Sequence, residues 1–157
     1  MNPKAYTLIR CGLFSSVRSN APKALWAWRI AVRSDKTLLR WYKLINRKFF
    51  DNQLPDNTCV RWINEREQEK YEDMYFAWTS DIEGTSQDDG YHKYVIVISK
   101  DKNPGKTAVL ATLIHEMIHV STGMRDDHGP AFEAQRQMLS DKGVFKKHAL
   151  LRGLTIF

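Results

Sequence analysis

The sequence predicts an α+β fold in which about three short strands form a small antiparallel or mixed sheet, packed with helices that precede and follow it. Three observations support this fold class. Apolar residues recur at helical spacing in residues 35–50 and in residues 110–120. Between these segments lie short stretches rich in β-branched and aromatic residues, separated by polar joins. A chain of 157 residues with 43% apolar content is long enough to bury one core.

Residues 1–34 form a predicted basic N-terminal extension, ahead of a domain that covers residues 35–157. The extension contains six Lys or Arg residues, several serines and no acid. Leu25, Trp28 and Val32 recur at helical spacing, which predicts that part of it is helical. This composition is compatible with packing on the domain, with nucleic-acid contact and with mitochondrial targeting, and the apolar stripe favours packing.

Positive charge is concentrated at one end of the chain. Residues 1–48 hold eleven Lys and Arg against one acid, a balance of +10, whereas residues 49–157 hold thirteen against seventeen, a balance of −4. Such a one-ended charge indicates a polyanionic partner.

Two further absences narrow the class of protein. No apolar run approaches the ~20 residues that a membrane-spanning helix needs, so we expect no membrane partner. The sequence does not indicate an oligomeric state, and a monomer is the default expectation. The two cysteines, Cys11 and Cys59, form no paired motif, which argues against a disulfide framework and against a cysteine zinc site. We therefore expect an intracellular location, in the cytoplasm, the nucleoid or the nucleus.

The first helix of the domain is predicted at residues 35–50, with Ser34 or Asp35 as its N-cap. Large apolar residues share one side of this helix and predict its buried face: Leu38, Trp41, Tyr42, Ile45 and Phe49. A row of cations lies on the opposite side: Lys36, Arg40, Lys43 and Arg47. This basic ridge is either the solvated side of an amphipathic helix or a surface that follows a phosphate backbone.

Three strands are predicted after this helix, near residues 58–63, 74–79 and 92–98. The joins at residues 64–73 and 80–90 are polar, and the first of them carries five acids. The second join could border a substrate cleft or be a solvated hairpin loop.

His115 and His119 carry the strongest functional signal. They lie four residues apart in a segment that reads as helix, so both imidazoles face the same side and can bind one metal ion. Glu116 lies too far round the helix to be a third ligand in that row. It can act instead on a metal-bound water, as the general base of a hydrolase.

The remaining positions of this helix divide by size. Large apolar residues lie opposite the histidines and predict the side that faces the core: Leu110, Leu113, Met117 and Val120. Small residues lie on the histidine side and leave room for a metal ion and a substrate: Ala108, Ala111 and Thr112.

A catalytic zinc ion needs a third protein ligand. His128 follows nine residues after His119, and Pro130 suits the first turn of a helix near residues 130–141. Glu133 on that helix is the competing third ligand. Two nearby carboxylates could orient a ligand imidazole: Asp126 and Asp127.

Several segments resemble one known family. Residues 112–119 (TLIHEMIH) and 128–132 (HGPAF) resemble the SprT-like (Spartan-type) zinc metalloproteases. Residues 46–55 and 60–62 resemble the opening helix and first strand of that family, so the resemblance covers about residues 36–141. It implies a zincin-like fold and a zinc-dependent endopeptidase that cleaves proteins on DNA, including proteins crosslinked to it.

The resemblance also implies roles for individual residues. His115, His119 and His128 would bind one Zn²⁺ ion, and Glu116 would be the catalytic residue. Zinc on three neutral imidazoles lowers the pKa of its water towards ~7, and Glu116 would take a proton from that water and pass it to the leaving amine. The oxyanion would need a donor, for which four residues are candidates: Tyr91, His92, Tyr94 and Arg125.

Two other functions stay open from the sequence. The same site could hydrolyse a non-protein substrate, because a Lewis acid polarises any carbonyl. Alternatively, the chain could be a metal-binding, nucleic-acid-associated protein without protease activity.

Overall fold

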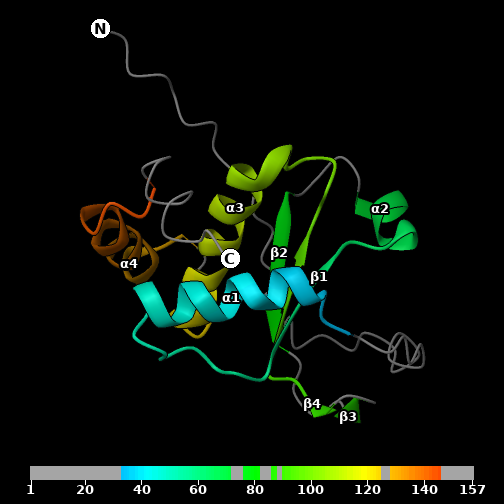
Figure 1. Ribbon diagram of the computed structural model, residues 1–157, viewed down its shortest axis with the longest axis horizontal. Helices are drawn as coiled ribbons and strands as arrows, with labels where there is room; N and C mark the ends of the chain where they lie inside the picture. Colours follow the sequence, from blue (N-terminus) through cyan, green and yellow to red (C-terminus); the bar gives the residue numbers. More distant parts are fainter. Residues whose placement is uncertain (1–32, 72–75, 82–85, 88–89, 125–127, 146–157) are drawn as a thin grey trace, which may run out of the picture.

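The fold is α+β, with four helices and a three-stranded mixed sheet in the part of the chain that the structure describes (Figure 1). The structure is a computed structural model, and it describes residues 33–71, 76–81, 86–87, 90–124 and 128–145. The helices are α1 (Lys36–Phe49), α2 (Glu65–Tyr71), α3 (Gly105–Ser121) and α4 (Pro130–Asp141). The strands are β1 (Thr58–Trp62), β2 (Ala77–Asp81), β3 (Ser86–Gln87), β4 (Gly90–Tyr91) and β5 (Tyr94–Ile98).

Strand β5 occupies the centre of the sheet. It pairs in parallel with β1, with Val60 opposite Ile96, and antiparallel with β2, with Thr79 opposite Ile96. All five residues of β5 are buried. A strand that is covered on both faces reads as a continuous apolar run rather than as an alternating one, which explains the unbroken apolar stretch at residues 94–98.

The predicted strand positions were confirmed for two of the three strands. The strand expected at residues 74–79 instead begins at Ala77 and ends at Asp81. Its register follows β5, because the pairing runs from Ala77 opposite Ile98 to Asp81 opposite Tyr94. The join at 80–90 was predicted as a cleft border or a solvated hairpin loop. Its described residues include β3 and β4, which pair with each other as a two-stranded antiparallel sheet.

The join at residues 64–73 contains helix α2, which was not predicted. Its start is a reciprocal cap. The Glu67 backbone N–H donates to Asn64 Oδ1 at 3.0 Å, and the Asn64 backbone N–H donates to Glu67 Oε2 at 3.1 Å. Glu67 also accepts two hydrogen bonds from Arg61 of β1, at 2.6 and 2.7 Å. These bonds anchor the short helix to the sheet.

Helix α1 matches its prediction closely. The Asp35 carboxylate accepts hydrogen bonds from the backbone N–H groups of Thr37 and Leu38, at 2.9 and 3.0 Å, so Asp35 is the N-cap. Ser34 has a different role, because its Oγ accepts from the backbone N–H of Val60 in β1. Of the predicted buried face, only Trp41 is partly exposed, and it packs at the margin of the core.

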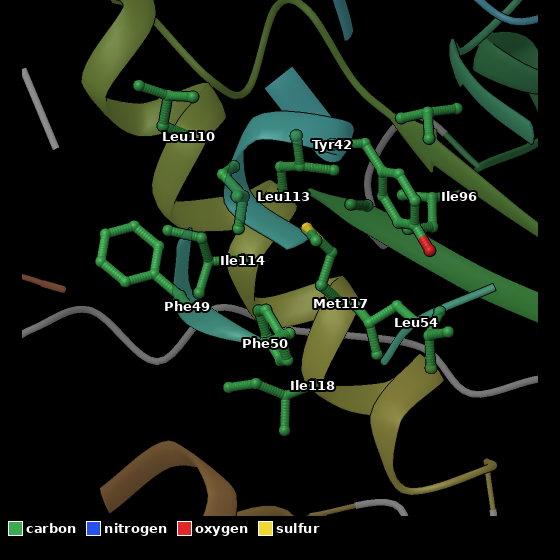
Figure 2. Packing of buried hydrophobic residues seen from close by; sticks show 14 of the residues in the cluster. Tyr42, Phe49, Phe50, Leu54, Ile96, Leu110, Leu113, Ile114, Met117 and Ile118 are labelled. Carbon is green, nitrogen blue, oxygen red and sulfur yellow. The ribbon is translucent and has the colours of Figure 1, made fainter. Parts of the chain in front are cut away.

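The main hydrophobic core lies between α1, α3 and one face of the sheet. Figure 2 shows Tyr42 of α1 and Ile96 of β5 beside Leu113 and Met117 of α3. A smaller buried cluster occupies the opposite face of the sheet: Cys59, Trp78, Val95 and Val97. Strand β2 therefore turns alternate side chains to opposite faces, with Ala77 in the main core and Trp78 in the smaller cluster.

Helix α3 is buried on more sides than predicted. The expected core residues are buried, but so are Thr112, Glu116 and His119, at 2%, 0% and 0% exposure. The helix contacts α1, the sheet and α4, which leaves little of its circumference open. Thr112 does not line an open space as predicted, because it is buried and its hydroxyl donates a hydrogen bond to the buried side chain of Asn103.

Some predictions fall outside the described residues. These include the helical stripe of the N-terminal extension, at Leu25, Trp28 and Val32. Within the described part of the chain, no helix is both long and apolar enough to cross a membrane.

Candidate metal centre

Two helices bring three histidines together. His115 and His119 lie one turn apart on α3, and His128 lies just before α4. The end of α3 reverses the chain through a Schellman turn, in which the Met124 N–H donates to the His119 carbonyl and the Gly123 N–H to the Val120 carbonyl, both at 3.1 Å. Gly123 has φ +67°, a conformation that glycine adopts without strain.

The histidine nitrogens lie close enough to share one ion. One ring nitrogen from each of His115, His119 and His128 lies within 4.8 Å of the other two. His115 Nε2 and His128 Nε2 are 3.0 Å apart. Zn–N bonds of about 2.0–2.1 Å in tetrahedral geometry place two ligand nitrogens roughly 3.3 Å apart. The three side chains could therefore hold a metal ion with small adjustments.

His119 distinguishes a metal site from a hydrogen-bonded histidine pair. The 3.0 Å contact between His115 and His128 fits a hydrogen bond as well as a shared ion. His119, however, is fully buried, and neither of its ring nitrogens has a hydrogen-bond partner among the described residues. A buried polar atom without a partner costs roughly 1–3 kcal/mol. A cation bound by one of these nitrogens would offset part of that cost.

Phe132 forms an apolar wall beside the histidines. It is 2% exposed and lies on the first turn of α4, where its ring centroid is 4.9 Å from that of His115 and 4.6 Å from those of His119 and His128. The wall excludes water from one side of the group. Burial of His119 and partial burial of His115 favour neutral imidazoles over imidazolium cations, whereas His128 is exposed.

The electrostatics of the group agree with that expectation. Burial lowers the pKa of His115 to about 3, and the neighbouring charges of His119, His128 and Arg136 act in the same direction. Burial also lowers the pKa of His119 to about 4, with a further contribution from His128. Both imidazoles are therefore neutral at pH 7, which is the form that binds a metal ion.

Glu116 lies beside this group but takes no part in it. Its side chain is fully buried, and Glu116 Oε2 accepts a hydrogen bond of 2.6 Å from the Thr79 hydroxyl of β2. The candidate metal-binding group in the described residues consists of the three histidines and does not include this carboxylate.

The competing ligand, Glu133, does not join the histidines. Its carboxylate is solvent-exposed and accepts two hydrogen bonds from Arg136, the shorter one at 2.6 Å. The predicted orienting carboxylates, Asp126 and Asp127, lie outside the described residues.

Of the four candidate oxyanion donors, the structure describes the side chains of two. Tyr94 is 7% exposed and lies in the main core, while His92 is partly exposed. Arg125 and the side chain of Tyr91 lie outside the described residues.

Sequence reasoning missed Thr79 and Phe132. Phe132 had a weak signal, since it follows His128 by four residues at the start of a predicted helix. Thr79 had none, because the packing of β2 on α3 brings it to a residue 37 positions away.

The basic ridge of α1 is open to solvent. Lys36, Arg40, Lys43 and Arg47 are all exposed, and none of them forms an ion pair within the part of the chain that is described. Helix α1 carries no acid in its own sequence. The ridge therefore presents four uncompensated charges on one side of the helix.

No protein-family model matches this chain, and no solved structure matches it.

Proposed function

We propose that this chain is a zinc-dependent endopeptidase with a zincin-like fold, in which His115, His119 and His128 bind one Zn²⁺ ion. The observation that carries the proposal is the unsatisfied, fully buried His119 imidazole within reach of two further imidazoles. Three neutral nitrogen ligands are the donor set of several catalytic zinc sites, which leave a fourth position open. The buried carboxylate of Glu116, the residue after His115, would supply the general base that hydrolysis also needs.

Zinc bound to the three histidines would supply a Lewis acid that polarises the peptide carbonyl and makes a water molecule acidic. The residues of the chain would transfer the protons and hold the ligands in place. Glu116 accepts a proton from the attacking water and passes it to the departing amine, so that its carboxylate is restored at the end. His115 and His119 hold their nitrogens in a fixed arrangement because one rigid helix carries both.

We infer that the protein substrates are presented on DNA, including proteins crosslinked to it. The support is the basic ridge of α1, where four exposed cations lack ion pairs among the described residues. Cations in a row can neutralise successive phosphates and release counterions. The concentration of positive charge in residues 1–48 points to the same class of partner.

The experiment is cleavage of a denatured protein by the purified, zinc-loaded chain, with and without single-stranded DNA. We expect cleavage that DNA accelerates, and no cleavage by Glu116→Gln, which should keep its zinc because Glu116 is not a ligand. Full activity of Glu116→Gln would refute the general-base role. Zinc binding without proteolysis would favour the two remaining functions, a hydrolase of another substrate class or a metal-binding protein that is not a protease.

A further inference from the structure

The Thr79 side chain has a contact that its place in a sheet does not require. Thr79 lies in the middle of β2, is 1% exposed and pairs with Ile96 of β5 through the backbone. The backbone of Thr79 makes the pairing with β5, and the side-chain hydroxyl takes no part in that pairing. That hydroxyl reaches across to α3, where it lies 2.6 Å from Glu116 Oε2 and 3.5 Å from the Glu116 carbonyl oxygen.

The shorter of the two contacts is the dominant one. A hydroxyl has a single proton to donate, and a distance of 2.6 Å is typical of a charge-assisted O–H···O⁻ bond. Threonine is β-branched, so its χ1 angle has few accessible values. The donor is consequently rigid, because the strand holds its backbone and its rotamer is restricted.

We propose that Thr79 is a positioning residue for Glu116, which fixes the carboxylate in the orientation from which it accepts the proton of the attacking water. A glutamate carboxylate, which is carried on three side-chain torsions, would otherwise sample several orientations. Fixing one oxygen to the sheet selects one of them before substrate arrives, and such preorganisation lowers the barrier. This inference rests on the proposed function, and it adds a residue from β2 to a site otherwise built from α3 and α4.

Variants of Thr79 separate this role from simple structural support. Thr79→Val removes the hydroxyl and preserves the shape, whereas Thr79→Ser retains the hydroxyl. Thr58→Val is the matched control, since Thr58 is also 1% exposed and also donates its hydroxyl proton, to the Pro55 carbonyl at 2.9 Å. The Thr58 hydroxyl also accepts a hydrogen bond of 3.0 Å from the Tyr42 hydroxyl. Thr58 lies at the start of β1, and its hydroxyl bonds to Pro55 and Tyr42 rather than to a residue of α3.

In the DNA-stimulated cleavage assay we expect Thr79→Val to lose roughly 10–100-fold in kcat with little change in KM, as for other residues that orient a reacting group. Thr79→Ser should recover most of this loss. Thr58→Val should keep the wild-type kcat although it loses both hydrogen bonds of a buried hydroxyl. Unchanged kcat in Thr79→Val, or an equal loss in Thr58→Val, would overturn the inference.

Cobalt substitution supplies a second readout that needs no substrate. The visible absorption bands of Co²⁺ in place of zinc report on groups near the ion. We expect Thr79→Val and Glu116→Gln to shift these bands, the double variant to match Glu116→Gln alone, and Thr58→Val to match the wild type. Bands in Thr79→Val identical to those of the wild type would contradict the inference.

The two readouts keep this inference distinct from the proposed function. If the wild type binds cobalt but cleaves no protein, the endopeptidase proposal fails and the spectra alone decide the role of Thr79. If the wild type binds no cobalt, the inference is overturned together with the metal site. Should Thr79→Val not fold, Thr79→Ala compared with Thr79→Ser makes the same test of the hydroxyl.

Discussion

His119 is the residue whose surroundings say most about this site. A histidine in a hydrophobic core normally satisfies both ring nitrogens with hydrogen bonds. Here both nitrogens are buried without a partner among the described residues, and burial lowers the pKa of the ring to about 4. The side chain is thus kept neutral in a place that is costly for it. Such a cost is expected where a site serves a bound ion rather than the stability of the metal-free chain.

The lowered pKa values of His119 and its neighbour His115 predict that the stability of the metal-free chain depends on pH. The folded pKa values of His115 and His119, about 3 and about 4, lie below the usual value of 6.5. At a pH between the folded pKa values and 6.5, the unfolded chain binds more protons than the folded chain. The free energy of unfolding therefore falls as pH decreases from about 6.5 towards 4, by up to about 1.4 kcal/mol per pH unit for each histidine.

Urea unfolding with a metal chelator at pH 7, 6 and 5 measures this dependence. The control is His119→Gln, which lacks one of the two titrating groups and should show a shallower slope over the same range. The same slope in both proteins would mean that His119 is protonated in the folded chain much as in the unfolded one.

At the scale of helices and strands, local signals decided what could be predicted. Helix α1 has Asp35 as its cap and α4 has Pro130 at its first turn, and both helices were predicted nearly to their ends. Helix α2 carries an equally local signal in the Asn64–Glu67 cap, which the polar composition of the segment obscured.

Features that depend on contacts between distant segments could not be predicted from the sequence. Residues before Ala77 are apolar and aromatic and favoured an earlier strand, yet β2 begins only where β5 offers a partner. In the site, the three histidines could be predicted because helical periodicity and a short turn relate them. Thr79 and Phe132 could not be assigned from spacing, since packing between β2, α3 and α4 brings them to the site.

Helix α1 carries the prediction that belongs to this scale. Arg40→Glu combined with Lys43→Glu reverses two neighbouring exposed charges of the ridge without touching the buried face. We expect weaker binding to DNA and a smaller dependence of affinity on salt, with the slope of log K against log[salt] reduced by roughly two units. Fluorescence anisotropy with a labelled oligonucleotide at several salt concentrations measures both quantities.

The matched control reverses two lysines away from α1, Lys100→Glu combined with Lys102→Glu. It changes the net charge by the same amount, so it corrects for long-range attraction. Equal losses of affinity in the two double variants would show that net charge matters and that the ridge is not a contact surface.

For the whole molecule, the candidate metal centre lies where α3 turns back into α4. An ion held by His115, His119 and His128 would link these two helices, and ligands that bind only the folded state stabilise it. The basic ridge lies on α1, which packs on α3 through the common core. Substrate presentation and hydrolysis would therefore depend on one continuous, rigid set of elements.

X-ray absorption spectroscopy at the zinc edge of the purified chain tests the central claim most directly. We predict one zinc ion per chain, with three imidazole nitrogens at about 2.0–2.1 Å and a fourth ligand that is the oxygen of a water molecule. In His128→Ala the spectrum should lose one imidazole and the zinc content should fall, while Glu133→Gln should match the wild type. A wild-type chain without zinc, or zinc with fewer than three imidazoles, would contradict this account of the protein.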